Sequence, residues 1–248
     1  MNRIKIAALA SLFFFTTSAL HSWQADDFLS IVERTEPNPQ SDTRFATLKE
    51  KIKESLQNSW CSEEKIDLLM DLTFIIRPRV CVEIGAFTGS SVLPVAAALQ
   101  YLDQGKIYAI DAWANEEAIR NLSPEDPNRS WWSTVDMSAV RNSFDQLLQG
   151  WNLLNVCTPI AKSSAQALPL IPEIDFLHLD GDFSEEGSLY DAKHYLAKVK
   201  PGGYVLLSNV YHTANKKLPK FKTFSYLLEI CEYISDADRD NTVLFRKL

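Results

Sequence analysis

Residues 80–91 read Val-Cys-Val-Glu-Ile-Gly-Ala-Phe-Thr-Gly-Ser-Ser. It begins with apolar and β-branched residues, which are typical of a buried parallel strand. It then passes through Gly85 and Gly89 into the apolar run 92–99, which predicts a helix. Glycine lets a backbone approach a ligand closely, and a helix N-terminus offers unpaired N–H groups. A strand, a glycine turn and a helix in this order therefore predict a ligand-binding turn.

Strand and helix patterns alternate along the rest of the chain. Further strands are expected at 106–110, 156–160, 174–179 and 204–207, followed by a hairpin with strands at 233–235 and 242–246. Helices are expected at 45–60, 62–76, 90–102, 137–149, 165–170, 185–199 and 221–230. The Pro-Gly-Gly sequence at 201–203 predicts a sharp turn before the fifth strand. This alternation predicts an α/β fold with right-handed crossovers and a mostly parallel sheet.

Polar side chains gather at the predicted carboxyl ends of the strands. They are Glu83, Asp111, Asp180, Asp182, Ser208 and Asn209. Because such sheets bind ligands beyond the carboxyl ends of their strands, we expect these residues to surround one site.

The second strand ends at Asp111, which suits hydrogen bonds to ribose hydroxyls, and Trp113 follows it with a ring that suits an adenine. A helix N-cap is the alternative for Asp111, and core packing is the alternative for Trp113. The glycines are spaced Gly85-x-x-x-Gly89 rather than Gly-x-Gly-x-x-Gly. A nicotinamide or flavin dinucleotide is therefore less favoured, although a nucleotide-dependent oxidoreductase remains a weaker alternative.

Residues 83–91 resemble the first motif of class I S-adenosylmethionine-dependent methyltransferases. They are most similar to the small-molecule O-methyltransferase branch related to catechol and caffeoyl-CoA methyltransferases, whose motif is E-I-G-x-x-T-G-x-S. Residues 108–111, 175–182 and 200–204 resemble later motifs of the same family, in the same order. The resemblance covers about residues 80–248. It implies a Rossmann-like, seven-stranded, mostly parallel sheet with helices on both faces and a reversed C-terminal strand.

The resemblance implies S-adenosylmethionine as cofactor and a small-molecule methyl acceptor, with transfer to oxygen. The glycine turn would hold the methionine part, Asp111 the ribose, and Ser163 or Ser164 the adenine edge, with Trp113 beside the adenine. Asp180 would face the methyl group or a metal. The cofactor-binding candidates are Glu83, Gly85, Ala86, Phe87, Thr88, Gly89, Ser90, Ser91, Asp111, Ala112, Trp113, Ser163, Ser164 and Asp180.

A metal and a general base are further candidates at this site. Asp180 and Asn209 match ligands of the metal-dependent branch, but Ser208 stands where that branch has an aspartate. Mg²⁺ prefers several charged oxygens, so a divalent cation is less expected than its absence, unless Asp182 compensates. The catalytic candidates are Asp180 and His212, the latter as a general base. An ordinary loop histidine is an equal alternative for His212.

The segment 114–136 is too long for an ordinary connection and lies beside the expected cofactor site. We interpret it as a lid or acceptor-binding segment, with Trp131 and Trp132 as apolar walls. The alternative is a surface excursion pinned by the two tryptophans.

The N-terminal residues 1–25 have the layout of a secretory signal. Arg3 and Lys5 precede the apolar run 6–15, and small residues follow it. We expect export or an uncleaved membrane anchor; a packed helix in a cytoplasmic protein is the alternative. The expected organisation is the signal-like segment 1–25, helices and a linker at 26–79, and the cofactor domain at 80–248.

Composition narrows the remaining function classes. The net charge of -7 argues against nucleic acid as a partner, and the four cysteines form no Cys-x-x-Cys pair that would suggest zinc. The expected partners are a small-molecule acceptor and, as an assembly, a homodimer. Because S-adenosylmethionine is a cytoplasmic metabolite, the signal-like start also favours an alternative: an exported, non-catalytic or degenerate binding protein of the methyltransferase type.

Overall fold

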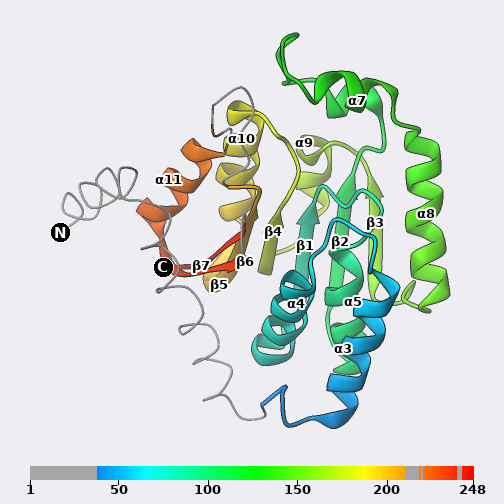
Figure 1. Ribbon diagram of the computed structural model, residues 1–248. Helices are drawn as coiled ribbons and strands as arrows, with labels where there is room; N and C mark the ends of the chain where they lie inside the picture. The colour runs from blue at the N-terminus through cyan, green and yellow to red at the C-terminus, as the bar shows by residue number, and fades with distance from the viewer. Residues whose placement is uncertain (1–37, 211–217, 219, 239–241) are drawn as a thin grey trace, which may run out of the picture.

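A seven-stranded sheet forms the centre of the computed structural model, which describes residues 38–210, 218, 220–238 and 242–248. The strand order is β3-β2-β1-β4-β5-β7-β6 (Figure 1). The strands are β1 (Val80–Ile84), β2 (Lys106–Asp111), β3 (Cys157–Ala161), β4 (Ile174–Leu179), β5 (Val199–Ser208), β6 (Cys231–Asp238) and β7 (Thr242–Lys247). β1 to β5 pair in parallel, and β7 runs antiparallel to both β5 and β6. The predicted Rossmann-like sheet with a reversed last strand is confirmed.

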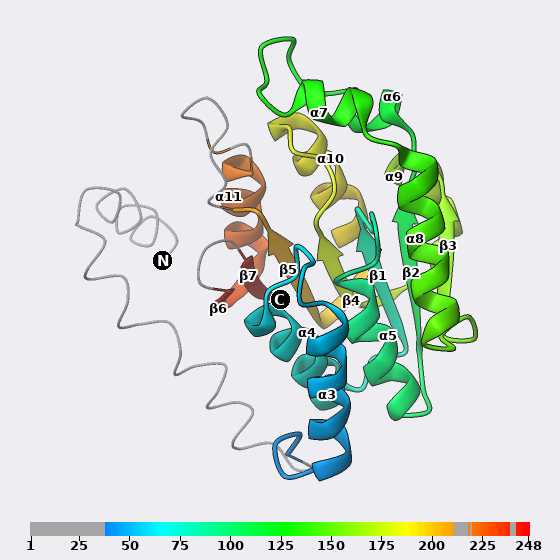
Figure 2. The same ribbon diagram turned by 45° about the vertical axis from the view of Figure 1, so that its right-hand side comes forward.

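Helices cover both faces of this sheet (Figure 2). One layer contains α3 (Thr43–Ser55), α4 (Glu63–Ile76), α5 (Val92–Tyr101) and α8 (Met137–Gly150). The other contains α9 (Ser164–Ala167), η2 (Leu168–Leu170), α10 (Glu185–Leu196) and α11 (Phe221–Ile230). Within β1, Cys81 packs into the first core and Val82 into the second, because successive strand residues face opposite sides. Both faces are apolar, as a parallel sheet requires.

The structure differs from the predictions at several segments. The helix predicted at 45–60 ends at Ser55, and the helix predicted at 185–199 ends at Leu196, because Val199 already begins β5. The stretch 114–136 is not fully irregular, since it contains the short helices α6 (Asn115–Ala118) and α7 (Arg129–Thr134). The Pro-Gly-Gly sequence at 201–203 lies inside β5 rather than before it. Val199 pairs with Ile174, whereas Tyr204 pairs with Phe176, so β5 accommodates its extra residues as a bulge against β4. Pro201 and the glycines bend the strand without ending it.

Helix α4 begins at a cap that fixes the position of its first turn. The Ser62 side chain accepts a hydrogen bond from the Lys65 backbone N–H, and Glu63 and Glu64 follow in the first turn. The helix then buries nearly every side chain from Lys65 to Phe74. Lys65 is thus held at the upper end of a buried helix, beside the carboxyl edge of the sheet.

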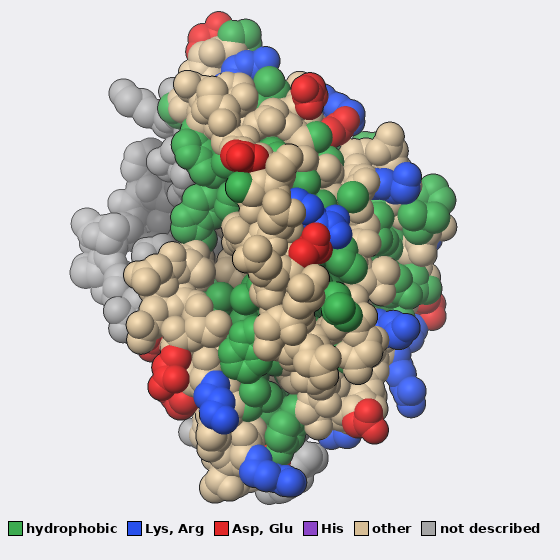
Figure 3. Space-filling model, turned by 90° about the vertical axis from the view of Figure 1, so that its right-hand side faces the viewer, with side chains coloured by type: hydrophobic (Ala, Val, Ile, Leu, Met, Phe, Trp, Pro, Cys, Tyr) green, Lys and Arg blue, Asp and Glu red, His purple; other side chains and the backbone are tan. Residues whose placement is uncertain are grey.

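Figure 3 shows the face of the molecule that carries α8, where acidic and basic side chains are interspersed. All four cysteines are buried, where cysteine packs as a small apolar side chain. No helix in the described part of the chain is both long enough and apolar enough to cross a membrane.

Candidate functional site

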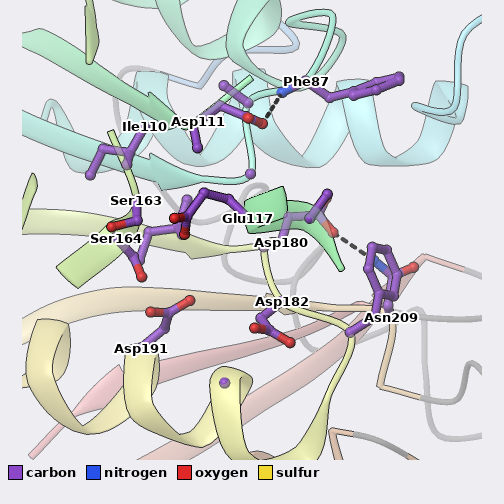
Figure 4. A pocket seen from close by; sticks show the side chains of 18 of the residues that line it. Phe87, Ile110, Asp111, Glu117, Ser163, Ser164, Asp180, Asp182, Asp191 and Asn209 are labelled. Atoms are coloured by element: carbon purple, nitrogen blue, oxygen red, sulfur yellow. Dashed lines mark hydrogen bonds between the residues drawn. The ribbon is translucent and has the colours of Figure 1, made fainter. Parts of the chain in front are cut away.

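A cavity of about 870 Å³ lies at the carboxyl edge of the sheet, between the strand ends and the segment 114–136 (Figure 4). This volume falls within the range of small-molecule sites. Asn209 lines the cavity near Asp180. Most of the predicted cofactor-binding residues line it too: Gly85, Ala86, Phe87, Ser90, Ser91, Asp111, Ala112, Ser163, Ser164 and Asp180. Glu83, Thr88, Gly89 and Trp113 are not among the lining residues.

The two glycines of the turn allow close packing. Gly85 has a φ of +90°, and a Cβ there would lie 2.7 Å from the Asp180 carbonyl oxygen. Gly89 has a φ of +87°, and a Cβ there would lie 2.8 Å from the Phe144 ring. Any side chain at either position would strain the backbone and collide with its neighbour. The turn is therefore pressed against the end of β4 and against α8, which fixes the floor of the cavity.

Glu83 lies beneath this floor and is fully buried. The Ser91 hydroxyl donates a hydrogen bond to Glu83 Oε1, and His178 Nδ1 lies 3.1 Å from Glu83 Oε2. These contacts brace the turn against β4 from inside the protein. The predicted role of Glu83 as a cofactor contact stays a prediction.

Asp111 joins the two loops that border the cavity. Its Oδ2 accepts a hydrogen bond from the Phe87 backbone N–H at 2.9 Å, and its Oδ1 accepts one from the Trp113 N–H at 2.8 Å. Burial raises the pKa of the carboxyl group, and the two N–H groups oppose that rise. Each carboxylate oxygen can accept a second hydrogen bond, so Asp111 can also receive ligand hydroxyls.

Trp113 packs beside the cavity but is not among the residues that line it. Its indole Nε1 donates to the Phe87 carbonyl oxygen at 2.9 Å, and the Arg141 guanidinium lies 4.4 Å from its ring centroid. Its ring also contacts Phe144 at 5.2 Å between centroids. The structure thus gives Trp113 the packing role that was its alternative, and a place beside the adenine stays a prediction.

A charged network occupies the other end of the cavity. Lys65 Nζ lies 2.9 Å from Asp180 Oδ2 and 2.9 Å from Ser208 Oγ. Asn209 Nδ2 donates to Asp180 Oδ1 at 2.6 Å, and His178 Nε2 lies 2.8 Å from Ser208 Oγ. Sequence reasoning missed Lys65. The available signal was a lysine in the first turn of a helix, where the helix dipole disfavours a cation.

The charges of this network stabilise each other. Burial acts to lower the pKa of Lys65, but the Asp180 carboxylate and further neighbouring groups together outweigh it, and the pKa is raised. Burial acts to raise the pKa of Asp180, but the Lys65 ammonium and further neighbouring groups together outweigh it, and the pKa is lowered. Both groups are therefore held in their charged forms.

The metal site implied by the resemblance does not fit these residues. Both oxygens of Asp180 already receive hydrogen bonds, one from an amide and one from an ammonium. A divalent cation needs several oxygen ligands, and here a positive charge lies 2.9 Å from the carboxylate. Asp182, the compensating candidate, binds the Ser184 N–H and the Asn121 amide. In the described residues, no group of three or more His, Cys, Asp or Glu side chains could hold a metal.

A second buried carboxylate lies near Ser164 in the cavity wall. Burial raises the pKa of Asp191 to about 7, and the Ser164 hydroxyl only partly opposes this. Sequence reasoning missed Asp191, although an acid on the face of α10 that also carries Ala192 and Tyr195 was a visible signal.

Aromatic side chains border the mouth of the cavity. The Trp60 ring stacks on Phe87 at 4.9 Å between centroids, with an angle of 2° between their planes. Trp131 lies 6.1 Å from Phe87, and Trp132 lies 5.9 Å from Phe183. The segment 114–136 is tied to the body of the protein by the hydrogen bond from Asn121 to Asp182. Trp131 and Trp132, the predicted apolar walls, both line the cavity, and Trp60 lines it from the loop between α3 and α4, which the sequence did not single out. The predicted base His212 lies outside the described residues.

Comparison with known proteins finds one matching family model and several solved structures of similar fold. A family model described as a methyltransferase domain matches residues 82–210. No curated protein matches the chain. Several solved structures share its fold.

The O-methyltransferase NovP has 18% sequence identity and a TM-score of 0.61, over 82% of this chain and 98% of that one. The O-methyltransferase TomG from Streptomyces achromogenes, in complex with SAM, has 14% identity and a TM-score of 0.54, over 92% and 97%. An O-methyltransferase from Bacillus cereus, in complex with SAH, has 14% identity and a TM-score of 0.56, over 92% and 99%.

Proposed function

Because this chain belongs to the methyltransferase domain family, we propose that it transfers the methyl group of S-adenosylmethionine to an oxygen of a small-molecule acceptor. The observation that carries the proposal is the cavity at the carboxyl edge of the sheet. It brings together the glycine turn, Asp111 and Asp180, which the sequence pattern assigns to one cofactor. The O-methyltransferases of similar fold, two of them bound to SAM or SAH, support the cofactor and the transfer to oxygen.

The positions of these residues along the strand ends suggest the direction in which the cofactor would lie. The turn from Gly85 to Ser91 lies at the start of α5 and would receive the methionine part. Asp111 would accept the ribose hydroxyls, and Ser163 and Ser164 would border the adenine. Asp180 lies at the opposite end, where its negative charge would favour a positively charged sulfonium.

The acceptor would enter between Asp180 and the aromatic mouth. Methyl transfer is a direct displacement, so the residues contribute mainly by aligning the two reactants and removing water. Trp131 and Trp132 supply apolar surface on the segment 114–136, which we propose to be a lid. His212 remains our proposed general base for the acceptor proton.

Calorimetric titration with S-adenosylhomocysteine tests this function without knowledge of the acceptor. We expect the intact protein to bind, and Asp111→Asn to bind about 10- to 100-fold more weakly, since a hydrogen bond to a charged group contributes about 1.5–3 kcal/mol. Asp103→Asn is the matched control, because Asp103 precedes β2 at the opposite edge of the sheet from Asp111. No binding by the intact protein would rule the proposal out.

No finding favours the alternative of a non-catalytic binding protein. Incubation with S-adenosylmethionine and a broad panel of phenols and alcohols separates the two, because only an enzyme yields a methylated product detectable by mass spectrometry.

We also propose that residues 1–25, which lie outside the described residues, direct export or anchor the chain in a membrane. The layout of Arg3, Lys5 and the apolar run 6–15 supports this address. Cell fractionation combined with sequencing of the mature N-terminus tests it, and an intact N-terminus in the soluble cytoplasm would contradict it. The proposed homodimer is tested by light scattering after gel filtration.

A further inference from the structure

A lysine side chain, Lys65, places a positive charge at the acceptor end of the cavity. Lys65 is only 7% exposed, yet it lines the cavity together with Asp180 and Ser208. Its ammonium donates to both of these neighbours at 2.9 Å. An ammonium has three donor hydrogens, so one remains to meet a ligand in the cavity.

The surroundings of this ammonium are those of a cation site. Asp180 supplies a carboxylate, and Ser208 supplies a hydroxyl that is also bound to His178. The Asn209 amide, directly after β5, donates to the other oxygen of Asp180. A metal ion bound to Asp180 from the cavity would have to displace Lys65 Nζ or accept a positive charge next to it.

We propose that Lys65 supplies the cation of the acceptor site in place of a divalent metal, and that its remaining N–H binds the acceptor oxygen. This inference rests on the proposed methyl transfer. Once the acceptor hydroxyl has given its proton to the proposed general base, the Lys65 ammonium stabilises the resulting oxyanion. The oxygen electron pair then forms the O–C bond while the C–S bond breaks, and its electron pair remains on sulfur as a neutral thioether. Lys65 keeps its proton throughout, so its role is electrostatic.

Titration with Mn²⁺ tests whether Lys65 occupies the metal position. Binding is measured as the loss of the electron paramagnetic resonance signal of unbound Mn²⁺. The wild-type protein and Ser208→Asp are expected not to bind the ion at this site, because Lys65 remains in place. The double variant Lys65→Met/Ser208→Asp removes the ammonium and places a second carboxylate beside Asp180. We expect it to bind Mn²⁺ at least about tenfold more tightly than Ser208→Asp alone.

Two results would overturn the inference. One is a single Mn²⁺ bound by the wild-type protein and lost in Asp180→Asn. The other is a double variant that is folded by circular dichroism but binds no more tightly than Ser208→Asp. If the double variant does not fold, the wild-type titration still decides, since a bound ion lost in Asp180→Asn contradicts the inference and its absence supports it.

Titration of the same samples with S-adenosylhomocysteine separates this inference from the proposed function. Lys65→Met is expected to keep its affinity within about threefold, because Lys65 lies at the acceptor end, away from Asp111. A wild-type protein that binds neither ligand would refute the proposed function. One that binds S-adenosylhomocysteine together with Mn²⁺ at Asp180 would refute only the role of Lys65.

Discussion

Two buried lysine–aspartate pairs involve helix α4, and they differ in what surrounds them. Lys49 of α3 lies 2.9 Å from Asp71 of α4, between two helices. Lys65 of α4 lies 2.9 Å from Asp180, at the end of β4. The first pair joins helix to helix away from the cavity, whereas the second joins helix to sheet edge and lines it. Equal distances therefore accompany different environments.

The pKa values of the two carboxyl groups shift in opposite directions. Burial raises the pKa of Asp71, and Lys49 does not fully oppose it. Burial also acts on Asp180, but Lys65 and further positive groups outweigh it and the pKa is lowered. At Asp71, Lys49 and Lys53 do not offset burial and the neighbouring Asp67 carboxylate, whereas at Asp180 the neighbouring groups do offset burial and favour the ionised form. The second arrangement suits a site that must present fixed charges to a ligand.

The largest expected effect is the loss of stability when either lysine is removed. Lys49→Met and Lys65→Met should each lower the free energy of unfolding by about 3–5 kcal/mol, because each leaves an uncompensated buried carboxylate. Urea unfolding measures both. A cost below about 1 kcal/mol for Lys65→Met would show that its pair is effectively solvent-exposed, which would end the comparison.

A third buried carboxylate extends the comparison to a group without a lysine partner. Asp191 makes no ion pair with any described residue, and its folded pKa of about 7 exceeds the unfolded value of about 3.9. Between these values the folded state binds more protons than the unfolded state. The free energy of unfolding should therefore fall as pH rises from about 4 to about 7, by up to about 1.4 kcal/mol per pH unit.

Asp191→Asn should remove this part of the pH dependence in the ligand-free protein. Thermal unfolding at pH values across that window measures the change. An unaltered pH profile in the variant would show that Asp191 is ionised in the folded state at low pH.

The smallest effect is expected at the neighbouring surface pair. Lys53 lies 2.9 Å from Asp67, but the Asp67 side chain is 39% exposed. Asp67→Asn should cost less than about 1 kcal/mol, and salt should reduce that cost further. Urea unfolding at low and high ionic strength tests this. A cost equal to that of Lys49→Met would show that burial is not what separates these pairs.

The sequence predicted those parts of the site that are local to a strand end. Gly85, Asp111 and Asp180 follow their strands directly, so topology alone brings them to one edge. For Glu83, the alternation of side chains along the strand could have predicted that its side chain faces the core rather than the cavity. Glu83 shares a face of β1 with Cys81, which packs into the core under α5, and its side chain is buried there.

The sequence did not predict that Lys65, Asp191 and Trp60 line the cavity. Lys65 and Asp191 belong to helices and Trp60 to the loop between α3 and α4, and the contact of each with the cavity depends on tertiary packing. Lys65 is 115 positions from Asp180 along the chain. Nothing in its local pattern states which carboxylate it meets.

The most direct test of the account compares methyl transfer by Lys65→Met and Lys49→Met, with EDTA present and an acceptor chosen from the phenol and alcohol panel. The account predicts that the wild-type protein and Lys49→Met transfer the methyl group at rates within about threefold of each other. Lys65→Met should be slower by about 100-fold or more, because it lacks the cation that stabilises the acceptor oxyanion. Equal rates for the two variants, or loss of wild-type transfer on addition of EDTA, would contradict it.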